Sequence, residues 1–299
     1  MRNTFILLIT ILLFSKVCFA QSQISKNVFT TTVGEYEVST LLETQQDGRK
    51  DILINATPEM LKKYMPTGTY FNATSVFLVR TPNKAILFDA GFGRNLFDNI
   101  QSLGIGAEDI NAIFLTHMHG DHIGGLLKDG NVTFPNADIY MSKMEHDYWM
   151  SDESMLQVPE NKRRGFVLAR NVIAAYKNKL RLFTPSELNG KKTDLTTDIQ
   201  GIATYGHTPG HTSYLISSKG SCILIWGDIT HVTTLQVENP DVAVTYDVNP
   251  ADAINIRKNV LEYVTKNKIP IAGMHVPFPG MGEIKINKEK RYEFIPYAK

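Results

Sequence analysis

The run Thr116–His122 constrains the fold of this chain more than any other feature of its sequence. Within six residues it supplies four side chains that can bind metal ions: His117, His119, Asp121 and His122. The first two histidines are two residues apart, so their imidazoles point to the same side at the end of an extended strand. Gly120 then lets the backbone turn and brings the other two side chains to the same cavity. Imidazole and carboxylate ligands together suit zinc or a similar transition metal.

Three more potential ligands lie just after apolar runs: His207, Asp228 and His275. The loop of His207 carries a second histidine, His211, four residues later. In α/β proteins the ends of strands are where ligand sites form. Five of the eight histidines lie near such ends, which sets them apart from isolated structural histidines. We therefore predict that the fold gathers them.

Length and charge bound the class of protein. The 299 residues are 43% hydrophobic and 20% charged, which is typical of a globular chain with a buried core. Lysine plus arginine number 31 and aspartate plus glutamate 30, so the net charge is +1. This balance does not favour nucleic acid or an anionic membrane as a partner. We expect a small-molecule substrate and no nucleic acid, and the sequence leaves a homodimer open.

The first 20 residues have the layout of a secretory signal peptide. Arg2 gives a positive start, Phe5–Phe14 is apolar, and Ala20 offers a small residue for cleavage. A membrane anchor is the alternative, but the apolar run is shorter than the roughly 20 residues that span a bilayer. We predict cleavage after Ala20 and a secreted or periplasmic protein with no stable membrane span. Only Cys222 then remains, which leaves no intrachain disulfide.

Hydrophobic periodicity predicts a loose lead-in over 21–31 and a single domain over 32–299. Helices are expected at 57–64, 166–180 and 253–264, and strands at 33–42, 75–80, 84–89, 112–116, 181–183, 199–204, 222–226 and 269–274. The segments 283–286 and 291–296 form a predicted closing hairpin. This order predicts two sheets with helices outside.

The motifs T-H-x-H-x-D-H, G-H-T-P-G-H and G-D, followed by a late histidine, resemble the metallo-β-lactamase fold superfamily from about Ser75 onward. The resemblance implies an α/β fold, an αββα four-layer sandwich with metals at one edge between the sheets. It also implies two metal sites with these ligands: His117, His119 and His207 for one, and Asp121, His122 and His275 for the other. Asp228 would bridge the two divalent ions, for which zinc is expected. His211 would orient neighbouring ligands.

A narrower resemblance, to the secreted methyl parathion hydrolase branch, rests on three segments: 207–212, 227–229 and 275–280. Met144–Trp149 is similar to a segment of that branch that contributes a pocket aromatic. Phe92, on the glycine loop after Asp89, and Trp149 are predicted to line an apolar substrate pocket. The alternative for both is an ordinary core or rim aromatic, and for Trp149 the two interpretations weigh equally. His231 is a third pocket candidate. Acyl-homoserine lactonases usually carry a tyrosine at this position. The histidine here therefore weakens the case for a quorum-quenching role.

The predicted activity is metal-dependent hydrolysis of an ester, lactone or phosphotriester bond. Two metal ions would share a bridging hydroxide that attacks carbon or phosphorus. Asp228 is the predicted bridge, and Asp121 the predicted ligand that also shuttles the proton. The alternatives are a β-lactamase or thioester hydrolase of the same fold and, in another class, a non-catalytic metal-binding protein.

Overall fold

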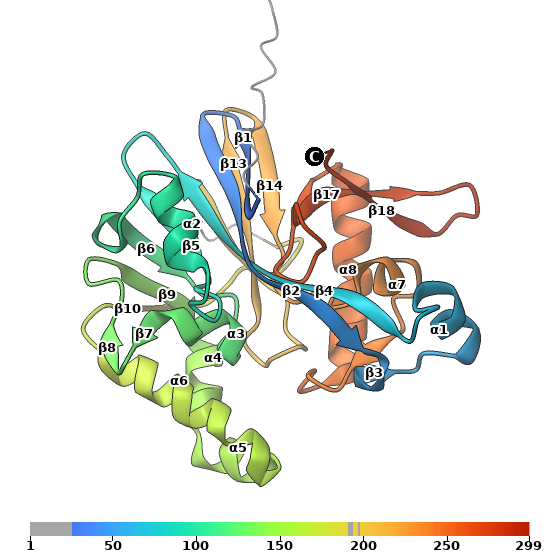
Figure 1. Cartoon of the computed structure of the whole chain (residues 1–299), viewed down its shortest axis with the longest axis horizontal. Helices are drawn as coiled ribbons and strands as arrows, with labels where there is room; N and C mark the ends of the chain where they lie inside the picture. The colour runs from blue at the N-terminus through green and yellow to red at the C-terminus, as the bar shows by residue number, and fades with distance from the viewer. Residues whose placement is uncertain (1–25, 191–193, 197, 299) are drawn as a thin grey trace, which may run out of the picture.

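The computed structural model describes residues 26–190, 194–196 and 198–298 (Figure 1). Within these residues the strands form two seven-stranded sheets and two short two-stranded ones, β15–β3 and β7–β8. The first large sheet has this order: β1 (Val28–Val33), β2 (Tyr36–Arg49), β4 (Thr69–Arg80), β5 (Ala85–Phe88), β6 (Ile110–Phe114), β9 (Asp138–Ser142) and β10 (Leu180–Phe183). The second has this order: β11 (Asp194–Thr196), β12 (Ile199–Ala203), β13 (Thr212–Ser218), β14 (Ser221–Ile225), β16 (Ile271–Ala272), β17 (Met281–Ile286) and β18 (Tyr292–Pro296).

The helices flank these sheets, and the short strands lie in the connections. The α-helices are α1 (Pro58–Tyr64), α2 (Leu96–Ser102), α3 (Gly120–Ile123), α4 (Lys143–Met150), α5 (Asp152–Gln157), α6 (Arg164–Ala175), α7 (Thr233–Glu238) and α8 (Pro250–Asn267). The short strands are β3 (Leu53–Ile54), β7 (Leu127–Lys128), β8 (Asn131–Val132) and β15 (Ala243–Val244), and 3-10 turns occupy Lys50–Ile52, Ala107–Asp109, Gly124–Leu126 and Glu160–Lys162.

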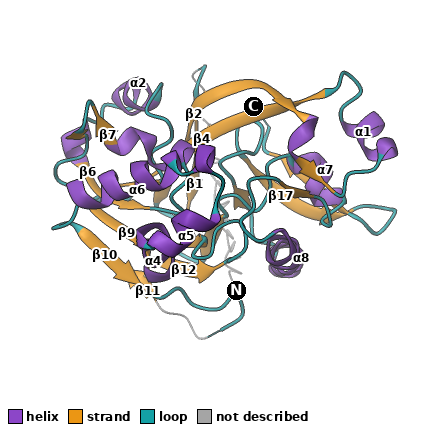
Figure 2. Ribbon diagram, turned by 90° about the horizontal axis from the view of Figure 1, so that it is seen from below, coloured by secondary structure: helices purple, strands orange, loops and turns teal. Residues whose placement is uncertain are grey.

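Buried side chains divide the core into layers. Between the sheets, Phe77, Phe88 and Phe114 of the first sheet pack with Tyr214 and Ile216 of the second. On the outer face of the first sheet a cluster joins its strands to α2 and α6, and on the outer face of the second a cluster joins its strands to α8. Both views place α2 and α6 on the opposite side of the molecule from α8 (Figures 1 and 2). The predicted αββα sandwich is therefore confirmed.

Strand direction brings the ligand loops together. In the first sheet β5, β6 and β9 run parallel, and in the second β14 and β16 run parallel. The segment that contains His117 follows β6, Asp228 follows β14, and His275 follows β16. The carboxyl ends of parallel strands meet at one edge of a sheet, which is where open α/β folds place their sites.

Several sequence-based expectations hold in detail. Helix α1 begins as predicted, with Pro58 at its first position and the Thr57 side chain accepting a hydrogen bond from the Met60 N–H. The closing hairpin forms from β17 and β18. None of the helices in the described parts of the chain has the length and apolar character needed to cross a membrane.

Several boundaries differ from the prediction, and the helix predicted over 166–180 ends at Ala175. Residues 28–31, predicted as a loose lead-in, belong to β1, which pairs along its length with β2. The strand predicted over 33–42 is two strands, because Gly34 adopts φ +59° and its missing Cβ lets the turn approach Ser218. The strand predicted over 269–274 shrinks to Ile271–Ala272, because the backbone leaves the sheet to carry His275. The signal peptide predicted over residues 1–20 lies outside the described residues.

Candidate metal centre

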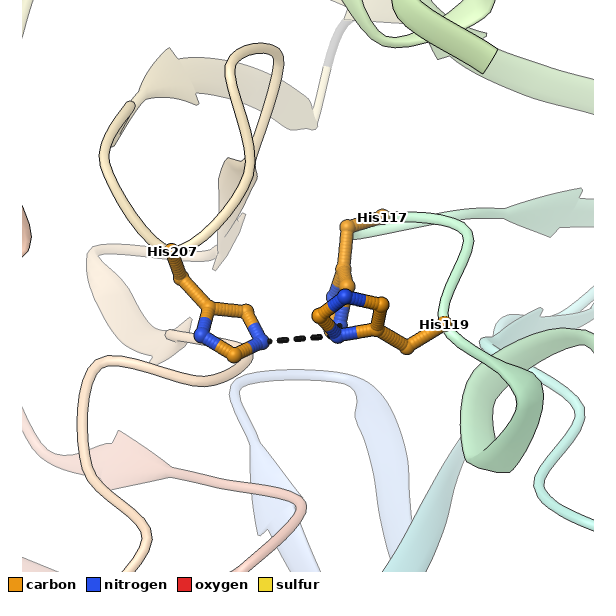
Figure 3. A group of neighbouring side chains, drawn as sticks. All are labelled: His117, His119 and His207. Carbon is orange, nitrogen blue, oxygen red and sulfur yellow. Dashed lines mark hydrogen bonds between the residues drawn. The ribbon is translucent and has the colours of Figure 1, made fainter. Parts of the chain in front are cut away.

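Three histidines converge into what we call the first ligand group, made of His117, His119 and His207 (Figure 3). The Nδ1 atom of His119 lies 3.0 Å from the Nε2 atom of His117 and 3.0 Å from that of His207. In two of these rings the outer nitrogen, the one that faces away from the group, makes a hydrogen bond. His117 Nδ1–H donates to Thr116 Oγ1 at 3.0 Å, and His207 Nδ1–H donates to Asp247 Oδ1 at 2.8 Å. Their inner nitrogens therefore present lone pairs to one point when the rings are neutral.

The second ligand group consists of Asp121, His122 and His275. Asp121 Oδ2 lies 3.4 Å from His275 Nε2, and its Oδ1 lies 3.9 Å from His122 Nε2. The outer nitrogens again have partners: His122 Nδ1–H donates to Asp89 Oδ2 at 2.6 Å, and His275 Nδ1–H donates to the Ala73 carbonyl at 2.8 Å. Asp121 is the exposed member, with 25% of its side chain accessible.

Asp228 stands between the two groups and contacts both. Its Oδ2 lies 3.3 Å from His207 Nε2 and 3.2 Å from His275 Nε2, and its Oδ1 lies 3.3 Å from His122 Nε2. The Asp228 side chain is 2% exposed. One carboxylate thus offers an oxygen to each group, as the predicted bridging role requires.

The donor set fits a cation. His122 Nε2 and Asp228 Oδ1 are both buried and, although 3.3 Å apart, neither has a hydrogen-bond partner. A buried polar atom without a partner costs about 1–3 kcal/mol, so two of them in one place need compensation. In each ligand group the three ligand atoms lie within 4.8 Å of one another. Imidazole nitrogens and carboxylate oxygens are the donors that zinc and similar ions take.

His211 lies behind the ligands. Its Nε2 accepts a hydrogen bond from the backbone N–H of Asp228 at 3.0 Å, and its Nδ1–H donates to the Thr204 carbonyl at 3.1 Å. Gly227, at φ +64°, makes this contact feasible, because a Cβ there would lie 2.5 Å from His211 Nε2. His211 therefore holds the backbone that presents Asp228.

The three predicted pocket residues end up in different places. His231 belongs to the ligand cluster itself, because its Nε2 lies 3.1 Å from Asp228 Oδ2 and its ring stacks on His275 at 4.8 Å. Trp149 touches the cluster, with its ring edge-on to His119 at 5.7 Å, but it is only 4% exposed and therefore does not line an open pocket.

Phe92 is an exposed residue that is not part of the ligand cluster. The ring is 41% exposed and carries the Arg94 guanidinium at 4.8 Å. It lines a shallow hollow together with Phe97 and Leu127, in which no ligand residue takes part. The glycine-rich loop after Asp89 turns Phe92 outward, a direction that residue type alone does not reveal.

Sequence reasoning missed three residues that contact the cluster, Asp89, Tyr246 and Asp247. It also missed Glu145, which bonds to the loops that carry the first ligand group. Asp89 follows β5 as Asp228 follows β14, so its place at a strand end was an available signal. Glu145, on α4, and Asp247, in a polar loop, offered none. Tyr246 is half exposed, with its ring 5.9 Å from that of His231, so it is the aromatic at the solvent side of the cluster.

The electrostatics of the cluster favour positive charge. Burial alone would raise the pKa of Asp228, but the surrounding imidazoles, His122 and His275 foremost, hold it well below its usual value. Burial alone would lower the pKa of His207, yet hydrogen bonds to Asp228 and Asp247 raise it to about 9. Burial alone would also lower the pKa of His275, but Asp228 and Asp121 outweigh that effect and raise it to about 10. The carboxylates therefore retain protons on these rings, and a bound cation would replace those protons.

Burial dominates at the other histidines. It lowers the pKa of His117 and His119 well below the usual range, with neighbouring imidazoles adding to the effect. It also lowers the pKa of His211 to about 3, which keeps that ring neutral. Neutral imidazole is the form that binds metal.

Residues 69–275 match the metallo-beta-lactamase superfamily, and the chain belongs to that family. Among curated proteins it is similar to the uncharacterized protein YobT of Bacillus subtilis (strain 168), with 30% identity over 54% of this chain and 64% of that protein. It is also similar to the hydroxyacylglutathione hydrolase of Aeromonas hydrophila, with 31% identity over 27% of this chain and 33% of that enzyme. The chain thus spans less than two thirds of each of these curated relatives.

Two solved structures match over nearly their whole length. The hydrolase AbOPH of the beta lactamase superfamily superimposes with a TM-score of 0.82 and 29% identity, covering 93% of this chain and 99% of that one. AidC, a dizinc quorum-quenching lactonase in complex with a product, superimposes with a TM-score of 0.83 and 27% identity, covering 91% and 98%.

Proposed function

We propose that this protein is a dinuclear metal-dependent hydrolase that cleaves an ester, lactone or phosphotriester bond. The observation that carries the proposal is Asp228, one buried carboxylate shared by two complete ligand groups. We assign His117, His119 and His207 to one ion, Asp121, His122 and His275 to the other, and Asp228 to both. Zinc is the proposed metal, since a dizinc enzyme is among the structural neighbours.

Bound divalent ions would lower the pKa of water to roughly 7 and polarise the oxygen that gains charge during hydrolysis. The protein's part is to hold seven ligands in place, and hydrogen bonds to the outer nitrogens hold four of the histidines, His117, His122, His207 and His275. Asp121 is proposed to accept the proton released in the reaction at a carboxylate oxygen. Burial raises its pKa, but His122 and His275 outweigh that effect and lower it, so the carboxylate is ionised.

The substrate is proposed to approach from the side of Asp121 and Tyr246. Asp121 is a partly exposed ligand, and Tyr246 is half exposed beside His231. An aromatic ring next to the ligands would pack on the apolar part of a small molecule. A lactone is the first substrate to test, because the neighbour AidC is a lactonase. We also propose that the protein belongs to the secreted methyl parathion hydrolase branch of the family.

The test combines metal analysis with a hydrolysis panel. Purified protein is expected to hold about two metal ions per chain and to hydrolyse an aryl ester, a lactone or a phosphotriester. Chelation should remove the activity, and zinc should restore it. Absence of metal would overturn the proposal. Turnover of only a β-lactam, or only a glutathione thioester, would favour the alternative activities of the same fold.

Export is a separate proposal. We propose that residues 1–20 direct secretion or transfer to the periplasm and are removed after Ala20, so that the metal centre works outside the cytoplasm. Sequencing the N-terminus of protein recovered from the extracellular or periplasmic fraction tests this. A mature chain that still begins with Met1 would contradict it.

A further inference from the structure

Glu145 is a buried carboxylate in helix α4 that touches no ligand side chain, yet it contacts the loops of all three members of the first ligand group. The residue is 1% exposed. Its Oε1 accepts hydrogen bonds from the Met118 N–H at 2.9 Å and from Trp149 Nε1–H at 2.6 Å. Its Oε2 accepts from Thr208 Oγ1–H at 2.7 Å and from the Gly210 N–H at 3.0 Å.

Three of these four donors adjoin a ligand of the first group, and the fourth, Gly210, lies in the same loop as His207. Met118 lies between His117 and His119 in the sequence, and Thr208 directly follows His207. Trp149 packs edge-on against the His119 ring. A single carboxylate therefore connects the loop after β6 to the loop after β12, which contribute the two sides of this group (Figure 3).

The local sequence normally suggests another use for Glu145. Ser142-Lys143-Met144-Glu145 has the S-x-x-E spacing of a capping box, in which the glutamate bonds back to the start of its own helix. Here Ser142 caps the helix by accepting a hydrogen bond from the Met144 N–H. The two Glu145 oxygens have about four lone-pair positions, and four other donors occupy them.

Gly210 makes the contact between its loop and helix α4 sterically feasible. A Cβ at this position would lie 2.0 Å from the Glu145 nitrogen and 2.4 Å from its Cα, so only glycine allows the loop to approach the helix this closely. The glycine of the G-H-T-P-G-H motif thus serves the contact with α4. Burial raises the pKa of the Glu145 carboxyl, and the hydrogen bonds from the four donors oppose that rise because they favour the ionised form.

We propose that Glu145 is a positioning residue that fixes the distance between the two loops of the first ligand group and thereby sets the metal affinity of that group. This inference rests on the proposed metal centre. The second group has a different buried carboxylate, Asp89, which accepts directly from His122 Nδ1–H. Asp89 reaches the first group only indirectly, because it accepts from Thr116 N–H and Thr116 Oγ1–H and the same Thr116 oxygen contacts His117 Nδ1.

The test compares Glu145→Gln with Asp89→Asn, which make the same oxygen-to-amide change in two buried carboxylates. Zinc occupancy of each group is read from anomalous scattering in crystals equilibrated at graded free zinc. Losing a partner behind a metal ligand typically weakens binding 10- to 100-fold. Glu145→Gln is expected to weaken the first group by about that factor and the second group far less, with Asp89→Asn showing the reverse.

Thr208→Val provides a second variant if Glu145→Gln does not fold. It removes one of the four donors at nearly constant volume and should weaken the first group in the same direction but less. Equal weakening of both groups in each variant would mean a general loss of structure and would overturn the inference, as would unchanged occupancy in both. Wild-type protein that binds no zinc in either group would instead overturn the proposed function.

Discussion

The two ligand groups differ in composition and in what surrounds them. The first consists of three imidazoles supported by Glu145 and Asp247, and two of them, His117 and His207, are at most 2% exposed. The second contains a carboxylate, Asp121, with a quarter of its side chain exposed. Each group thus has two buried members and one partly exposed member, which is His119 in the first and Asp121 in the second. The partly exposed member is an imidazole in the first group and a carboxylate in the second, so the two groups differ in the side chain that they present to solvent.

The largest expected effect comes from removing what the two groups share. Asp228→Ala should reduce hydrolysis by more than about 100-fold, beyond the loss typical of an outer partner, because both ions lose a ligand at once. His146→Ala is the matched control, since His146 is a partly exposed residue of α4 whose ring contacts Asp147. Steady-state rates and metal content of both variants provide the measurement. Wild-type rates in Asp228→Ala would refute the shared-ligand assignment.

The next effect separates the groups. His207→Ala and His275→Ala should each lower the metal content from about two ions to about one per chain, because each removes a ligand from a different group. The remaining ion should occupy the first group in His275→Ala and the second in His207→Ala. Metal analysis and anomalous scattering identify which ion is lost. Loss of both ions in both variants would show that the groups do not bind independently.

A moderate effect is expected from pH on the metal-free protein. The pKa of His207 is raised to about 9 and that of His275 to about 10, with that of His122 also raised, against an ordinary value of 6.5. Between pH 6.5 and about 9 the folded chain therefore holds more protons than the unfolded chain, so the free energy of unfolding falls as pH rises.

Metal binding should release these protons, so zinc affinity is expected to increase over the same pH range. Denaturant titrations of metal-free protein and zinc binding in buffers of different ionisation enthalpy measure the two trends. Stability that rises across this range in the metal-free protein would contradict the assignment of protonated histidines.

The smallest effect tests a region remote from the ligands. Tyr36 lies at the start of β2, and its hydroxyl donates to Asp198 at 2.6 Å. Tyr36→Phe should cost about 1 kcal/mol of unfolding free energy, the usual contribution of one hydrogen bond. Metal content should stay the same in this variant. A change in metal content would show that the edge of the sandwich is coupled to the centre.

The proposed ligand residues could be predicted from the sequence because they lie in segments that follow strands in the chain. His117, Asp228 and His275 come directly after apolar runs, so local periodicity was enough to nominate them. The same reasoning found α1, since Thr57 and Pro58 act on their nearest neighbours. It failed at Gly34, where one residue with positive φ divides a predicted strand into two.

The supporting residues could not be predicted in this way. Glu145 bonds to Gly210, 65 residues away, Asp247 to His207, 40 residues away, and Asp89 to His122, 33 residues away. His231 and Trp149 were both predicted for a pocket, but one entered the ligand cluster and the other was buried against it.

The sequence by itself determined which side chains can bind metal and that strands deliver them, because both properties belong to residue type and short-range spacing. The tertiary structure alone decided how these side chains divide into two groups and which carboxylates hold each group. Hydrogen bonds between segments far apart in the chain depend on how strands and loops meet in space, and local patterns do not encode those meetings.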